Sequence, residues 1–170
     1  MSKAFTKEDD AEAPVALPRL VSPLEPGTRN LLTPAGAREL HAELRHLQEA
    51  RRPPLVAGAQ SDGEARRQLE ALDQRIAYLQ ESLGSAEIVP PPSVADDRAR
   101  FGATVTVEDP SGDKLSYRLV GVDETDLDRN WVSWQSPIAR ALLNARIGDR
   151  VSFKFPSGKT ELLIVAIEYQ

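Results

Sequence analysis

The 170-residue chain has no cysteine, and this absence excludes several kinds of site at once. Disulfide bonds, thiolate metal sites and cysteine nucleophiles all need a thiol that the chain does not offer. No apolar run approaches the ~20 residues of a membrane span, and residues 1–10 lack the apolar core of a signal peptide. We therefore expect a cytoplasmic protein with no membrane as a partner.

A block of like charge is missing as well. The chain has 21 lysines and arginines against 26 aspartates and glutamates, and the resulting charge of −5 is spread along its length. A protein that holds duplex DNA through phosphates normally has a basic face. We expect no direct sequence-specific DNA binding. A protein partner, or nucleic acid already held by another protein, fits this composition better.

Combinations of side chains that would make a self-sufficient active site are also absent. His41 and His46 are five positions apart, so they miss the i, i+4 spacing of a helical metal pair. No serine–histidine–acid set and no glycine-rich phosphate loop occurs. The sequence predicts no metal site of the protein's own and no enzyme activity of its own.

The first thirty residues form an extension that we expect to be disordered. Pro14, Pro18, Pro23 and Pro26 recur too closely for regular structure, and the apolar residues between them show no period.

Residues 31–86 are predicted to form an antiparallel helical hairpin of the coiled-coil type. Thr33 supplies an N-cap and Pro34 a first-turn proline. Apolar residues then recur at steps of three and four, as in a heptad seam: Ala37, Leu40, Leu44 and Leu47, then Leu69, Leu72, Ile76, Leu79 and Leu83. The short seams favour pairing within one chain and a monomer, while an intermolecular coiled coil is the alternative. Gly84 is predicted to end the second arm.

A linker and a sheet domain follow the hairpin. Residues 87–99 contain Pro90, Pro91 and Pro92, which predict a stiff, extended linker. Residues 100–170 contain several runs typical of strands, separated by turns at 109–113 and 156–159, and one short helix beginning at Pro137. The predicted fold class is therefore α+β, with a mainly antiparallel sheet.

The most specific pattern in the chain lies at 131–149. It is a strand containing Trp131 and Trp134, a Ser136–Pro137 turn, a short helix and a turn at Gly148–Asp149. Four further segments occur in the same order as in one protein family: a Leu-Thr-Pro-x-Gly start of the hairpin, 100–105, 117–124 and the final Glu-Tyr. On these residues the chain resembles the GreA/GreB family of bacterial transcript cleavage factors over roughly 1–10 and 31–170, and its first ten residues look GreB-like.

The resemblance implies a fold and a partner. The C-terminal domain would be FKBP-like and would dock on the rim of the RNA polymerase secondary channel, with the hairpin inside the channel. Two acidic tip residues would help hold a catalytic Mg²⁺, which prefers hard oxygen ligands, and the polymerase would then hydrolyse the 3′ end of backtracked nascent RNA. The factor itself is no enzyme. A prolyl isomerase is a third hypothesis, which rests on fold analogy alone.

By the same resemblance, the tip acids are Asp62 and Glu64, and they would share the polymerase Mg²⁺. They are two positions apart, whereas the family pattern has them three apart. The leucine repeats imply about a dozen fewer residues than the family has, so each arm would be about 9 Å shorter at ~1.5 Å rise per residue. A non-cleaving channel binder is therefore the alternative function. A purely structural interpretation also exists, since Ser61 and Glu64 have the spacing of a capping box with Asp62 in the first turn.

The resemblance also assigns a docking loop and an RNA-facing surface. Gln135, Ser136 and Pro137 belong to the docking loop, with Gln135 where the family usually has Asp, and a simple turn and N-cap is the alternative. Trp131 and Trp134 would face opposite sides of a strand, and the exposed one, here assigned as Trp134, would join the interface. Basic residues on both arms would guide the RNA, or would only form a solvated helix face: Arg51, Arg52, Arg66 and Arg67. Pro53 and Pro54, inside the first arm, predict a kink.

Overall fold

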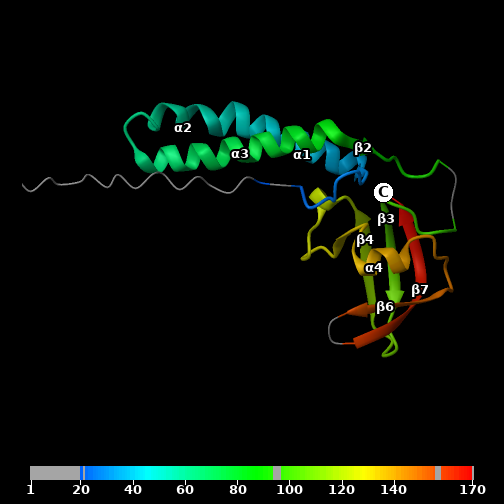
Figure 1. The fold of residues 1–170 in the computed structure, drawn as a ribbon. Coiled ribbons are helices and arrows are strands. Elements are labelled where there is room, and N and C mark those ends of the chain that lie inside the picture. The colour runs from blue at the N-terminus through cyan, green and yellow to red at the C-terminus, as the bar shows by residue number, and fades with distance from the viewer. Residues whose placement is uncertain (1–19, 21, 94–96, 156–157, 170) are drawn as a thin grey trace, which may run out of the picture.

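The structure is a computed structural model that describes residue 20 and residues 22–93, 97–155 and 158–169. It has two parts, a pair of long helical arms and a sheet with one short helix beside it (Figure 1). The predicted α+β class is therefore confirmed. Most of the extension predicted to be disordered, residues 1–30, lies outside the described residues, as do residues 94–96 of the predicted linker.

The first arm is made of three helical segments in series. Helix α1 (Pro34–His46) starts at the N-cap Thr33, whose hydroxyl accepts a hydrogen bond from the Gly36 amide at 3.0 Å. A π-helical segment, η1 (Leu47–Arg51), then leads into α2 (Arg52–Gly58). Pro53 and Pro54 thus lie in the first turn of α2, directly after a wider turn. In a regular α-helix, the ring of an interior proline clashes with the carbonyl four residues earlier. The wider π-helical turn before Pro53 changes this spacing, and so the arm accommodates both prolines.

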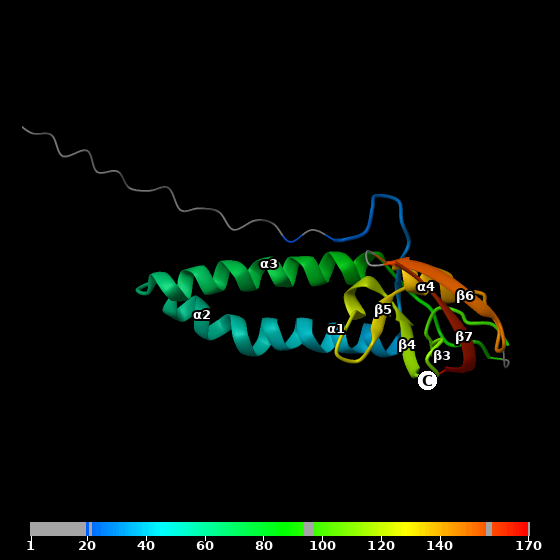
Figure 2. The same cartoon turned by 90° about the horizontal axis from the view of Figure 1, so that it is seen from below.

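The second arm is one helix, α3 (Gly63–Ser85), which runs antiparallel to the first arm (Figures 1 and 2). Its buried face carries Leu72, Ile76 and Leu79. Leu79 is fully buried and belongs to an apolar cluster with Leu32, Ala37 and Leu40. Full burial of such a side chain stabilises the folded chain by about 1.5–3 kcal/mol. The well-packed part of the arms is therefore the end nearest the sheet domain.

The predicted helix end at Gly84 is wrong by one residue. Helix α3 continues through Gly84 to Ser85, and Ala86 turns to an extended conformation with φ −71° and ψ 135°. Ala86 must be extended because it begins strand β2 (Ala86–Ile88), which pairs in parallel with β1 (Asn30–Leu32). Neither strand could be predicted from the sequence, because three residues are too few to show an alternating pattern.

The second part is a five-stranded sheet with the order β5-β4-β3-β7-β6. Its strands are β3 (Ala103–Glu108), β4 (Lys114–Val120), β5 (Trp131–Ser133), β6 (Arg150–Phe155) and β7 (Gly158–Tyr169). All neighbours pair antiparallel except β4 and β5, which are parallel. Residues Ala103, Val105 and Val107 alternate into the core. Helix α4 (Pro137–Leu142) adds Ala139 and Leu142 to the same cluster.

The arms and the sheet meet at a short 3₁₀ helix, η2 (Val122–Glu124), between β4 and β5. In Figure 2 the chain between these strands lies against the base of the arms. No helix among the described residues combines the length and the apolar character that a membrane crossing needs.

Candidate functional site

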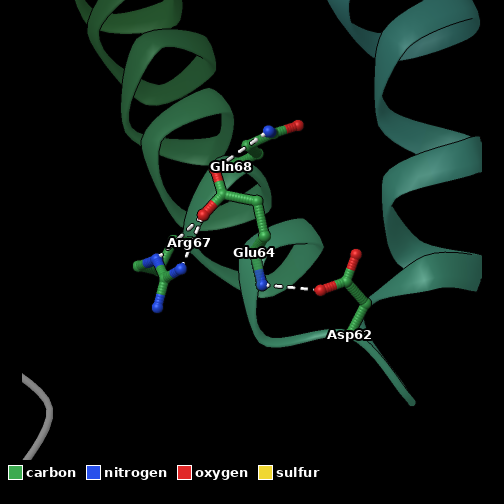
Figure 3. Close-up of polar contacts among 4 residues, drawn as sticks. All are labelled: Asp62, Glu64, Arg67 and Gln68. Atoms are coloured by element: carbon green, nitrogen blue, oxygen red, sulfur yellow. Dashed lines mark hydrogen bonds and ion pairs between the residues drawn. The ribbon is translucent and has the colours of Figure 1, made fainter.

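The far end of the arms, called here the tip, is the turn at 59–63 between α2 and α3. Asp62 is the N-cap of α3, and its Oδ1 accepts a hydrogen bond from the Glu64 amide at 2.8 Å (Figure 3). Ser61 does not cap the helix, so the predicted Ser61–Glu64 capping box is wrong. The helix begins one residue later, which places Glu64 at its second position rather than its third.

The Glu64 carboxylate is held by its own helix. Its Oε2 accepts hydrogen bonds from Arg67 Nη2 at 2.6 Å and Nε at 3.2 Å, and its Oε1 accepts from Gln68 Nε2 at 3.0 Å. The hydrogen bond from Arg67, then that from Gln68, and then the arginine's charge lower the pKa of Glu64. Figure 3 shows this carboxylate directed along α3, away from Asp62. The two tip acids are therefore close in sequence but have separate partners.

The tip has the donor chemistry for a hard cation but too few ligands to hold one alone. No described residue donates a hydrogen bond to the second carboxylate oxygen of Asp62, so this oxygen is available. Within the described part of the chain, no group of three or more His, Cys, Asp or Glu side chains is placed to bind a metal ion. Two carboxylates can complete a Mg²⁺ site that another molecule provides, since Mg²⁺ is commonly bound by one or two carboxylates with other oxygen ligands.

The four arginines predicted to face RNA lie near the tip, and three of them have partners within the chain. Arg52 Nε donates to Asp73 Oδ1 at 2.8 Å, which joins α2 to α3. Arg66 donates to the Ala59 carbonyl at 3.2 Å and closes the turn. Arg67 pairs with Glu64, while Arg51 is exposed and has no hydrogen bond or ion pair to a described residue.

The predicted docking loop is a tight turn at the edge of the sheet. Ser136 caps α4, and its hydroxyl accepts from the Ala139 amide at 3.2 Å, with Pro137 as the first helical residue. The Ser136 amide donates to the Ser133 carbonyl at 2.8 Å, and the Gln135 amide donates to the Ser133 hydroxyl at 3.2 Å. Pro137 is exposed, while Gln135 and Ser136 are half-buried. The turn therefore has a defined shape and presents its proline to solvent.

The two tryptophans are not on opposite faces of one strand. Strand β5 ends at Ser133, so Trp134 lies in the turn after it, and both indoles are half-buried. Two guanidinium groups contact the ring of Trp131, that of Arg118 at 4.8 Å and that of Arg129 at 5.2 Å from its centroid. The Trp134 Nε1 is buried and has no hydrogen-bond partner among the described residues. The prediction of one core and one exposed tryptophan is wrong because the strand is shorter than expected.

Asp123 and Glu124, for which the sequence predicts no role, lie in η2, where Glu124 contacts the first arm and Asp123 the second. Glu124 accepts a hydrogen bond from the Thr33 amide at 2.9 Å, and Asp123 accepts one from the Tyr78 hydroxyl. Both acids lie in the segment 117–124, and Thr33 lies in the Leu-Thr-Pro-x-Gly start of the hairpin. Both segments contribute to the family resemblance. The partners are 91 and 45 positions apart, so no local pattern could reveal that they meet.

Two projecting arms with a polar tip are joined to a sheet domain with a Ser-Pro turn at its edge, which defines a two-part architecture. A family model, "Transcription elongation factor, GreA/GreB, C-term", matches residues 94–169. Together with relatives that are 34–38% identical over more than four fifths of the chain, this match shows that the chain belongs to the GreA/GreB family.

Two curated relatives support this membership over most of the length of the chain. The chain is 38% identical over 152 residues to a protein named transcription elongation factor GreB from Xanthomonas axonopodis pv. citri, covering 82% of this chain and 90% of that one. It is 34% identical over 151 residues to a transcription elongation factor GreA from Acidiphilium cryptum, covering 81% and 96%. Among solved structures, the GreA factor homolog 1 (Gfh1) protein of Thermus thermophilus is 31% identical, with 83% and 99% covered and a TM-score of 0.38.

The alignment to GreB also bears on the length of the chain. The alignment has 152 positions, which is more than the number of residues in 82% of this 170-residue chain. Some positions of the relative therefore have no counterpart here. Shortened arms would require such gaps.

Proposed function

We propose that this protein is a transcription elongation factor that binds RNA polymerase at its secondary channel. Membership of the GreA/GreB family supports this, because relatives of similar length carry the name transcription elongation factor. In this proposal the sheet domain, which the family resemblance implies is FKBP-like, docks through Trp134, Gln135, Ser136 and Pro137. The ordered Ser136–Pro137 turn, with its exposed proline, supports that assignment.

The arms then carry the tip to the polymerase active site, where it promotes cleavage of backtracked RNA. The chain is an accessory factor, and the polymerase performs the hydrolysis. Magnesium, when bound there, supplies charge neutralisation at the reacting phosphate. Asp62 offers its available oxygen to this shared ion, and Glu64 offers its carboxylate once it leaves Arg67 and Gln68. The exposed pair of acids at the end of the arms is the observation that carries this function.

The arginines near the tip are proposed to contact the 3′ segment of the nascent RNA. Arg51 is available for a phosphate as it stands. Arg52, Arg66 and Arg67 would exchange contacts within the chain for contacts to RNA. Exposed ion pairs of this kind contribute only about 0–1 kcal/mol, so phosphate oxygens can replace them at little cost.

A non-cleaving channel binder is the second candidate. The observation that favours it is the Glu64–Arg67 ion pair, which neutralises one of the two tip acids. The short arms inferred from the sequence act in the same direction. Such a factor would occupy the channel and modulate or inhibit the polymerase without completing its active site.

Binding to purified RNA polymerase tests what the two candidates share. The docking variant is Ser136→Asp with Pro137→Ala, because aspartate caps a helix as well as serine does and the fold is kept. The matched control is Ser111→Asp with Pro110→Ala in the exposed β3–β4 turn. We expect the parent and the control to bind and the docking variant to lose most of its affinity. Equal binding by all three would refute the docking assignment, and no binding by the parent would refute the function.

A further inference from the structure

The joint between the arms and the sheet domain is built on two neighbouring carboxylates of η2. Glu124 faces the start of the first arm: its Oε2 accepts from the Thr33 amide at 2.9 Å, and its Oε1 accepts from the Thr33 hydroxyl. The Gly121 amide also donates to Glu124 Oε2, at 3.0 Å. One side chain of the sheet domain thus binds both the backbone and the side chain of the residue that caps α1.

Asp123 faces the end of the second arm. Its two oxygens accept hydrogen bonds from the Tyr78 and Ser82 hydroxyls of α3. The Tyr78 hydroxyl is protonated and can donate at physiological pH, and burial, followed by the hydrogen bond to Asp123, raises its pKa further above that range. Because one carboxylate binds each arm, rotation of the arms about either contact would break the other.

Two glycines let the two parts approach this closely. A Cβ on Gly36 would lie 2.0 Å from Glu124 Oε1, and a Cβ on Gly121 would lie 2.2 Å from the Leu31 carbonyl. Neither separation is compatible with two non-bonded atoms. The joint therefore needs glycine on both sides, in the Leu-Thr-Pro-x-Gly start of the first arm and immediately before η2.

We propose that Asp123 and Glu124 are positioning residues that fix the direction of the arms relative to the sheet domain. This inference rests on the proposed function, in which the sheet domain docks and the tip acts at a distance. Helix α3 has 23 residues and is about 35 Å long, so a tilt of ~10° at the joint moves the tip by about 6 Å. Metal ligation tolerates errors of only tenths of an ångström, so a loose joint would place the tip acids out of reach.

The joint can be tested in the free protein, because a chain without cysteine accepts two labels at chosen sites. Spin labels on Ser61→Cys at the tip and Ser111→Cys in the β3–β4 turn report the distance between the two parts. Gly36→Ala displaces the Glu124 carboxylate without changing any charge. Its matched control is Gly84→Ala, also in a helix, where a Cβ would meet nothing within 4 Å.

We expect one narrow distance distribution for the parent and for Gly84→Ala. Gly36→Ala should broaden or shift it, and so should Asp123→Asn, which removes a charge without adding an atom that clashes. Asp123→Asn keeps the test decisive should Gly36→Ala fail to fold. Distributions identical to the parent's in folded joint variants would overturn the proposal.

A second measurement separates this inference from the proposed function. A photo-crosslinker attached at residue 61 reports where the tip lies in a complex with purified RNA polymerase. We expect Gly36→Ala to bind polymerase like Gly84→Ala, because the docking loop is untouched, but to lose crosslinking to the active-site region several-fold. Parental crosslinking by Gly36→Ala would overturn the positioning role. A parent that does not bind would refute the proposed function, while the spin-label distances still decide whether the joint is rigid.

Discussion

At the scale of single residues, Asp62 and Ser61 differ in what they do for the start of α3. Asp62 accepts the Glu64 amide, whereas the side chain of Ser61 has no such contact. We predict that Asp62→Ala lowers the free energy of unfolding by about 1 kcal/mol, the usual cost of a lost N-cap. Ser61→Ala should leave it nearly unchanged. Urea denaturation followed by circular dichroism measures both, and a larger loss for Ser61→Ala would contradict the assigned cap.

The charge state of Glu64 depends on Arg67. The arginine lowers the pKa of Glu64. At pH values above the ordinary glutamate pKa, the ionised pair therefore makes its full contribution to stability. This contribution is lost as the pH falls through the lowered pKa. Both side chains are exposed, at 57% and 72%, so salt screens the interaction.

We predict that the Glu64 carboxyl titrates below its ordinary pKa in the parent and closer to it in Arg67→Gln. Carbon-13 NMR of the side-chain carboxyl measures this directly, and added salt should shift only the parent. A midpoint that does not change in Arg67→Gln would show that the ion pair is absent in solution.

At the scale of elements, the arms are stabilised mainly at their base. Leu79 is fully buried, whereas Leu127, in the loop before β5, is 81% exposed. We predict that Leu79→Ala lowers the free energy of unfolding by about 2–5 kcal/mol, as buried leucine truncations do. Leu127→Ala should have almost no effect. Thermal or urea unfolding tests the pair, and equal effects would mean that the base of the arms is not packed as described.

How well each element could be predicted follows from how local its signals are. The leucine repeats predicted helices on both arms, because a helix that buries one face repeats apolar residues every three or four positions. Strands β1 and β2 were missed because each is three residues long and exists only through pairing with the other. Trp134 was misplaced for a related reason, since nothing local shows that β5 stops at Ser133.

At the scale of the whole molecule, the sequence predicted the two kinds of structure but not how they are joined. Thr33, Gly36 and Glu124 each look like ordinary cap, helix and turn residues when taken alone. Their association depends on contacts across 91 positions, and no periodicity carries that information. The tip differs, because its cap is a local contact between Asp62 and Glu64, and only the choice of Asp62 over Ser61 as the N-cap was missed.

The apolar seams of the arms also predict the oligomeric state of the protein. Leu72, Ile76 and Leu79 are buried within a single chain, so the arms have no apolar seam left for a second copy near their base. We predict a monomer with a mass of 18.7 kDa. Light scattering after size exclusion measures this, and a stable species of twice that mass would favour the intermolecular coiled coil instead.

The most direct test of the account is RNA cleavage in a purified, deliberately backtracked elongation complex. The parent is compared with Asp62→Ala/Glu64→Ala and with Ser111→Ala as a surface control far from the tip. The leading proposal predicts shortened RNA with the parent and the control and none with the tip variant. Polymerase binding without cleavage by the parent would contradict it and leave a channel binder that modulates the polymerase without completing its active site.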